Sequence, residues 1–357
     1  MSRTNDILEK TKRKEPEAKK WKVVVGIVVG LVLSLSILYG LYAVTEPIVQ
    51  SGDTSLSTID NLYAFYDLNI GEEETAVYFL GSSLTSFEIY SPLIDEELQK
   101  RGYDITTYNL FVEADTPRLR ALQIDEIIES QPSLVIYGVS YRTITTNSLH
   151  HGRTLASLNH IEFTPELKRF YTDSELISLN HGSFYQKGYV FENLKKAVKY
   201  VGTDTPSSSS PREISRETAL KYAKDSTSSW VKKKSNETKD MNAVIKALAN
   251  PTNDWRPVVP SGDTLNKQAF MYNVNKLEDA GIPVVIINMP VSPLLSEKIT
   301  DESRQNFYDY LDSTGVKWID METMYDDSHF FDYIHSTWEG SLDFSQKMVD
   351  LIIQELS

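Results

Sequence analysis

The chain has 357 residues, of which 41% are hydrophobic, and a formal net charge of −14. The length allows one large domain or two ordinary ones, and the apolar content suffices for a packed core. Residues 1–22 hold eight Lys/Arg and four acidic residues, so removing this +4 from −14 leaves −18 for the rest. An acidic body argues against a nucleic-acid partner, because phosphate binding needs clustered Lys and Arg. The absence of cysteine excludes disulfides, thiolate metal ligands and a Cys nucleophile.

Residues 23–44 form the first predicted element, a run of 22 residues without a charge. A helix of this length spans about 33 Å, which matches the hydrocarbon core of a bilayer. The apolar core of a signal peptide is shorter, about 7–15 residues, so we predict an uncleaved single-pass anchor in the cell membrane. Since the basic residues precede the span, residues 1–22 are predicted to be a cytoplasmic tail and the acidic remainder to be extracellular.

Residues 45–75 are interpreted as a stalk or as an entry segment of the domain, and residues 76–357 as the domain itself. Apolar runs rich in β-branched residues predict strands at 76–81, 105–110, 133–140, 282–290 and 316–320. Amphipathic stretches predict helices at 91–102, 116–130, 301–315 and the C-terminus. Continuous apolar strands that alternate with helices indicate an α/β fold with a parallel sheet covered on both faces.

Residues 150–275 interrupt this alternation between the third and fourth strands. They include the low-complexity stretch TDTPSSSSPREIS at 203–215, whose composition cannot pack a core. Helical pieces lie around it. We predict a partly helical insertion.

A candidate nucleophile follows the first strand in the stretch YFLGSSLTSFE, residues 78–88. The stretch SHFFDYIHSTWEG, residues 328–340, lies beyond the last strand, and in it Asp332 precedes His335 by three residues. The carboxyl ends of parallel strands meet at one edge of a sheet, so both segments are expected there. His335 could then take the proton of the serine, with Asp332 orienting the imidazole.

Two simpler interpretations stay open at this point. Serines after a strand are often turn residues, and an Asp-x-x-His pattern arises easily by chance. A metal site would use His329, Asp332 and His335, but on a helix these positions drift over about 120° at about 100° per residue. These three side chains cannot surround a metal ion without further ligands, so no metal and no other cofactor are predicted.

Gly81-Ser82-Ser83-Leu84 resembles the Gly-Asp-Ser-Leu block of the SGNH (GDSL) hydrolases, and Asp332-Tyr333-Ile334-His335 resembles their last block. The resemblance covers residues 76–149 and about 276–357, outside the insertion. It implies a flavodoxin-like three-layer α/β/α fold, with Ser83, His335 and Asp332 as catalytic nucleophile, base and orienting acid.

The two middle blocks depart from the family pattern. Ala114 stands where the family has a glycine whose N–H binds the oxyanion, and Arg142 stands where it has an asparagine. Both are therefore candidates for oxyanion or substrate binding, although Arg142 could equally form an ordinary ion pair. Asn288, after the fourth strand, is a candidate for lining the site, or else a turn residue.

The anchor and the HSTWEG stretch are most similar to the membrane-tethered members of this family. That similarity implies an outward-facing serine esterase or O-acyltransferase whose substrate is an acylated polysaccharide or similar ester of the cell envelope. A membrane-embedded acyltransferase is a possible partner. The alternative is a catalytically inactive subunit of an envelope-modification complex, and a purely structural surface protein is a third possibility.

Overall fold

The chain, in a computed structural model, is described over residues 17–50, 57–113, 115–145, 164–180, 214–236, 240–250 and 258–357. It divides into two units, one formed by Met1–Gly52 with Gln186–Arg212 and the other by Asp53–Tyr185 with Glu213–Ser357. The described part of the first unit is the helix α1 (Glu17–Gln50). Within it, Trp21–Gly40 is long and apolar enough to cross a membrane, with a mean hydropathy of 2.5. One apolar N-terminal helix, compatible with a single-pass anchor, is therefore present.

The second unit is built on a five-stranded parallel sheet with the strand order β2-β1-β3-β4-β5. The strands are β1 (Thr75–Leu80), β2 (Ile105–Asn109), β3 (Leu134–Val139), β4 (Val284–Asn288) and β5 (Trp318–Asp320). This is the flavodoxin-like order. The predicted fold class is confirmed.

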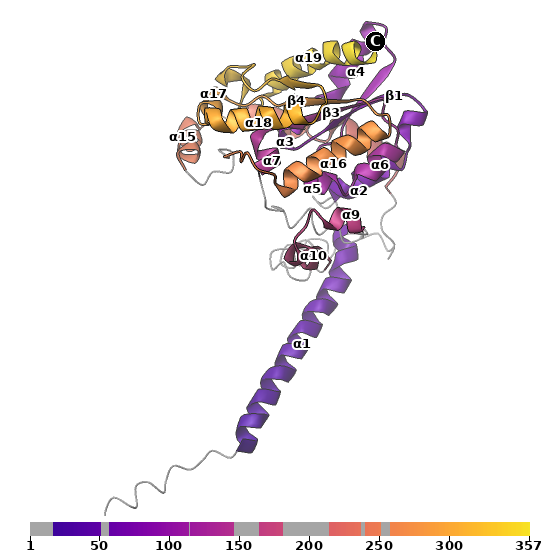
Figure 1. The fold of residues 1–357 in the computed structure, drawn as a ribbon. Helices are drawn as coiled ribbons and strands as arrows, with labels where there is room; N and C mark the ends of the chain where they lie inside the picture. Colours follow the sequence, from indigo (N-terminus) through magenta and orange to yellow (C-terminus); the bar gives the residue numbers. More distant parts are fainter. Residues whose placement is uncertain are drawn as a thin grey trace, which may run out of the picture. The chain divides into compact units, whose positions relative to one another are not determined.

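Both faces of the sheet are covered, which explains why the strands β1, β3 and β4 are apolar without alternation. In β1, Val77 and Phe79 belong to the core on one face, and Tyr78 and Leu80 to the core on the other. Figure 1 shows α4 (Ser91–Lys100) and α19 (Trp338–Leu356) on the first face. The second face is covered by α2 (Ser57–Tyr66), α5 (Pro117–Arg120), α6 (Ile124–Glu129), α16 (Leu265–Asp279) and α18 (Asp301–Ser313).

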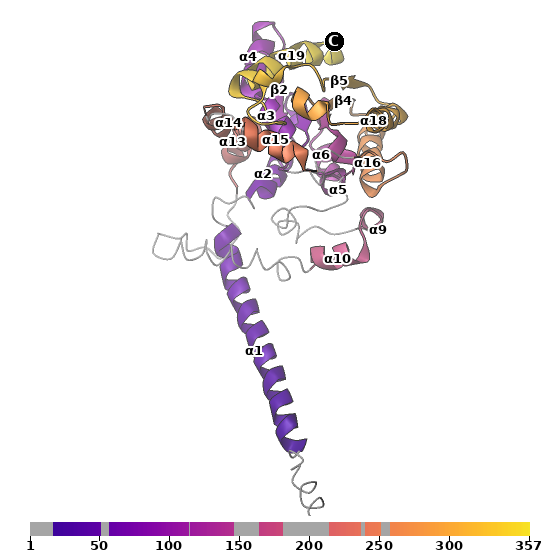
Figure 2. The ribbon, with the colours of Figure 1, turned by 90° about the vertical axis from the view of Figure 1, so that its left-hand side faces the viewer.

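Further helices surround this frame, and in Figure 2 α13 and α14 lie at the β2 end of the sheet, away from α16 and α18. The remaining elements are η2 (Ile70–Glu72), α3 (Ser83–Glu88), α7 (Tyr141–Thr145), α9 (Pro165–Lys168), α10 (Asp173–Asn180), α13 (Arg216–Asp225), α14 (Ser228–Ser235), α15 (Met241–Ala249), α17 (Pro293–Ser296) and η3 (Asp327–His329).

Three segments add detail to the sequence prediction. The helix α2, inside the segment interpreted as a stalk or entry segment, buries Leu62 and Phe65 in the core. The helix α16 lies inside the range assigned to the insertion, yet its apolar side chains belong to the same core. The single helix predicted at 116–130 is two short helices, because Leu122 and Gln123 donate to carbonyls three residues back and tighten the chain between them.

Candidate active site

Ser83 is the first residue of α3, two residues after Gly81, which directly follows β1. Gly81 has a φ of 149°, which few other residues adopt. A Cβ at Gly81 would lie 2.1 Å from Thr85 Oγ1, and one at Gly138 in β3 would lie 2.4 Å from the same atom. The buried Thr85 hydroxyl therefore fits between two glycines, and this close packing holds the start of α3 against the ends of β1 and β3.

Ser83, His335 and Asp332 form one chain of hydrogen bonds. His335 Nε2 lies 3.0 Å from Ser83 Oγ, and His335 Nδ1 lies 2.8 Å from Asp332 Oδ2. The side chains of His335 and Asp332 are 17% and 30% exposed, so the group is accessible from solvent. Residues 252 apart in sequence thus meet at the carboxyl edge of the sheet.

The carboxylate of Asp332 is held on both of its oxygens. Its Oδ1 accepts hydrogen bonds from the backbone N–H groups of Ile334 and His335, both at 2.8 Å. Burial raises the pKa of Asp332, but the hydrogen bond and the charge of His335, with the two backbone N–H groups, outweigh it and lower the pKa overall. Asp332 is therefore ionised at neutral pH and fixed in orientation.

Acid should weaken the native state through Asp332. Since its folded pKa lies below the unfolded value of about 3.9, the ionised carboxylate stabilises the fold at neutral pH, and this contribution is lost as the pH falls from about 4 through the folded pKa. We expect the Asp332→Asn replacement to lower the free energy of unfolding by more at pH 7 than at pH 3. Denaturant unfolding in detergent would measure this difference between wild type and variant at each pH. An equal difference at both pH values would contradict this.

The loop that carries His335 is closed on itself and packed against α3. Phe331 N–H donates to the His335 carbonyl at 3.0 Å, and Ser336 Oγ donates to the Phe87 carbonyl at 2.6 Å. The Phe87 ring lies 4.3 Å from the His335 ring, centroid to centroid. The imidazole is thus oriented by Asp332 on one side and by an aromatic ring on another.

Part of the predicted insertion also borders this site. From α14, Trp230 packs edge-on against Phe87 with ring centroids 4.7 Å apart, and its side chain is 44% exposed. Thr227 Oγ1 donates to the Ser86 carbonyl at 3.1 Å. The insertion therefore supplies an exposed aromatic residue to the rim of the site.

The sequence predicted three further site residues besides the serine, the histidine and the aspartate. Arg142 lies in α7, directly beyond β3, the strand beside β1. Asn288 ends β4, and its buried side-chain amide donates to Asp320 Oδ1 at 2.8 Å, so it binds the neighbouring strand end. Ala114 lies outside the described residues.

A metal interpretation gains no support from the geometry. His329 Nε2 lies 3.0 Å from Glu88 Oε2, whereas His335 contacts Ser83 and Asp332. Over the described ranges, no group of three or more His, Asp or Glu side chains is placed to hold a metal ion.

Sequence reasoning missed two buried pairs of ionisable side chains beside the site. One is Glu88 with His329. The other joins Arg120 to Asp115, whose Oδ2 accepts from Arg120 Nη2 at 2.6 Å and from Nε at 3.0 Å. Both Glu88 and Arg120 are 0% exposed. A charged residue in a short amphipathic stretch normally indicates an exposed face, so the sequence held no signal for either pair.

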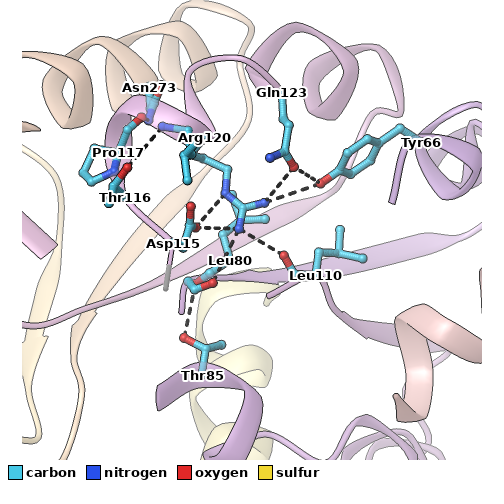
Figure 3. Close-up of polar contacts among 12 residues, drawn as sticks. Tyr66, Leu80, Thr85, Leu110, Asp115, Thr116, Pro117, Arg120, Gln123 and Asn273 are labelled. Atoms are coloured by element: carbon cyan, nitrogen blue, oxygen red, sulfur yellow. Dashed lines mark hydrogen bonds and ion pairs between the residues drawn. The ribbon is translucent and has the colours of Figure 1, made fainter. Parts of the chain in front are cut away.

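Figure 3 shows the guanidinium of Arg120 surrounded by acceptors. Besides Asp115, it donates to the Leu110 carbonyl at 3.1 Å and reaches Gln123 and Tyr66. Burial lowers the pKa of Arg120, but the charge of Asp115 outweighs it, so the pKa is raised and the guanidinium stays charged. This cluster ties the segment after β2 to α5.

The structure thus has a flavodoxin-like sheet with a serine, a histidine and an aspartate in one hydrogen-bonded chain at its carboxyl edge. A family model without a functional description matches residues 262–357, less than half of the chain. No curated protein matches the sequence. Among solved structures, the chain is similar to a "putative acylhydrolase" from Bacteroides fragilis, with 11% identity and a TM-score of 0.30 over 82% of this chain and 93% of that one. A likeness this weak carries no argument about function, which therefore depends on the site itself.

Proposed function

We propose that the protein is a membrane-anchored serine esterase or O-acyltransferase that acts on ester-linked acyl groups of cell-envelope glycans. The observation that carries the proposal is the Ser83–His335–Asp332 chain, with 3.0 Å between Ser83 Oγ and His335 Nε2. A serine is a weak nucleophile unless a base accepts its proton, and a fixed carboxylate keeps that base in the required tautomer.

In the first half of the reaction, Ser83 Oγ attacks the ester carbonyl carbon while its proton passes to His335 Nε2. The oxyanion that forms would accept hydrogen bonds from the N–H groups of Ser83 and Ala114 and from Arg142. His335 then gives the proton to the leaving alkoxide, and the acyl group stays on Ser83. In the second half, His335 takes a proton from water or from a sugar hydroxyl, whose oxygen attacks the acyl-enzyme. The bond between the acyl group and Ser83 Oγ then breaks, His335 returns the proton to Ser83, and the acid or the acylated sugar is released.

The membrane part of the proposal depends on α1 and its flanks. The basic residues of the 1–22 tail precede the apolar span, which favours a cytoplasmic tail and an extracellular catalytic domain. Protease treatment of intact cells should then remove the large domain and spare the tail. Protection of the large domain from protease in intact cells would indicate the opposite topology.

An activated serine is directly testable on the full-length protein in detergent. We expect a fluorescent fluorophosphonate to label the wild type and to fail with Ser83→Ala and His335→Ala, since one removes the nucleophile and the other its base. Ser82→Ala is the matched control, because the adjacent Ser82 side chain makes no capping hydrogen bond to α3; it should label like the wild type. Labelling that survives in Ser83→Ala would contradict the assignment.

The altered oxyanion positions, Ala114 and Arg142, favour a second candidate function, an inactive subunit of an envelope-modification complex. A folded wild-type protein that takes no label would support this candidate in place of the enzyme.

A further inference from the structure

A second contact joins α3 to the loop that carries His335. Glu88 is the last residue of α3 and is 0% exposed. Its Oε2 lies 3.0 Å from Nε2 of His329, whose side chain is 6% exposed. The reaction outlined above uses neither residue.

The His329 ring is held in place from two sides. The Tyr325 ring stacks on it with centroids 3.6 Å apart and an interplanar angle of 14°. At the start of α19, a Cβ on Gly340 would lie 2.7 Å from the His329 carbonyl oxygen and 2.9 Å from two ring atoms. Only glycine fits at position 340 without displacing His329. The close packing of Gly340 and Tyr325 around His329 therefore directs its Nε2 toward Glu88.

Both segments that meet here also meet at Ser83. The helix α3 carries Ser83 at its first residue and Glu88 at its last. The loop carries His329 before the Phe330–Ser336 bridge and His335 within it, and Thr337 N–H donates to the His329 carbonyl at 2.7 Å. A shift of His329 away from Glu88 would therefore move the base of the loop that positions His335.

We propose that Glu88 and His329 are positioning residues that fix the loop of residues 329–337 on α3 and thereby set the distance between Ser83 Oγ and His335 Nε2. The effect of these residues on the reaction rate rests on the proposed function, whereas their attachment of the loop to α3 does not. A misplacement of about 1 Å can cost about 10²-fold in rate.

The test compares variants of the full-length protein in detergent. Glu88→Gln keeps an atom that can bond to His329 in either tautomer and should label with fluorophosphonate at a rate close to that of the wild type. Glu88→Ala leaves His329 without this partner. Because that variant could fold poorly, the decisive variant is the double replacement Glu88→Leu with His329→Leu. A protein often keeps its stability when both partners of a buried polar pair are replaced by apolar side chains of similar volume.

We expect the double variant to label about 10²-fold more slowly than the wild type, with faster hydrogen–deuterium exchange at the Ile334 and His335 amides. Glu322→Ala is the control for general destabilisation, since Glu322 is 1% exposed and its side chain bonds to Arg304, Tyr141 and Ser296. It should lower the melting temperature and leave labelling unchanged.

The outcomes separate the two proposals. A double variant with wild-type labelling or wild-type exchange in the loop overturns the positioning role. If the wild type takes no label but loop exchange rises in the double variant, the loop attachment stands and the proposed enzymatic function fails.

Discussion

Asp332→Asn is expected to lower the rate at which fluorophosphonate labels Ser83 by about 10⁴-fold. The Asn side chain keeps the shape of Asp332 but can present an N–H to His335 Nδ1, which then carries no proton and leaves Nε2 protonated. A protonated Nε2 cannot accept the proton of Ser83, so the serine stays a weak nucleophile. Loss of the negative charge also removes the stabilisation of the imidazolium that forms.

The measurement is the second-order labelling rate of the full-length protein at neutral pH. Asp326→Asn is a matched control, since Asp326 lies in the same loop region and caps η3 by accepting from Ser328 N–H at 2.8 Å. The Asp326→Asn replacement should leave the labelling rate within a few-fold of the wild-type rate. A wild-type rate in Asp332→Asn would mean that the carboxylate only stabilises the loop.

Arg120→Met is expected to reduce the free energy of unfolding by about 3–5 kcal/mol. Methionine fills much of the same volume but leaves the Asp115 side chain, which is 3% exposed, without its cation. The Leu110 carbonyl and the Gln123 side chain lose a donor as well. An unpaired buried carboxylate is the costliest of these changes, because burial disfavours its charged form.

Arg101→Met is the matched control for this prediction. Arg101 pairs with Asp350 at the surface, with side chains 37% and 75% exposed, so its loss should cost at most about 1 kcal/mol. Denaturant unfolding followed by fluorescence would compare the two variants in the same detergent. Equal costs would show that the Arg120 cluster adds no more stability than a surface ion pair.

The sequence predicted the buried strands closely, because a strand buried on both faces must be an apolar run. The run at 133–140 contains β3 at Leu134–Val139, and the run at 282–290 contains β4 at Val284–Asn288. Long amphipathic helices such as α18 were equally readable. The split between α5 and α6 was not, since it depends on hydrogen bonds between residues three apart that leave no mark on the apolar pattern.

The residues of the candidate site also differ in how far the local sequence pattern predicts them. Ser83 follows an apolar run, and His335 has an acid at a spacing that allows one loop to hold both, so local pattern made them candidates; in the structure their Oγ and Nε2 atoms lie 3.0 Å apart. Asn288 was selected on similar grounds, but its amide bonds to Asp320 on the next strand, a pairing that depends on the order of strands in space.

The sequence by itself determined the apolar N-terminal helix, the strand and helix alternation, and the residue types of the Ser–His–Asp group, because each depends on composition and spacing along the chain. Only the tertiary structure decided that Arg120 is buried against Asp115 and that Glu88 bonds to His329. Burying an ionisable side chain costs free energy unless a hydrogen-bonding partner lies beside it in the folded chain. That partner lies 241 residues away for Glu88, and proximity of this kind follows from packing, which no local pattern encodes.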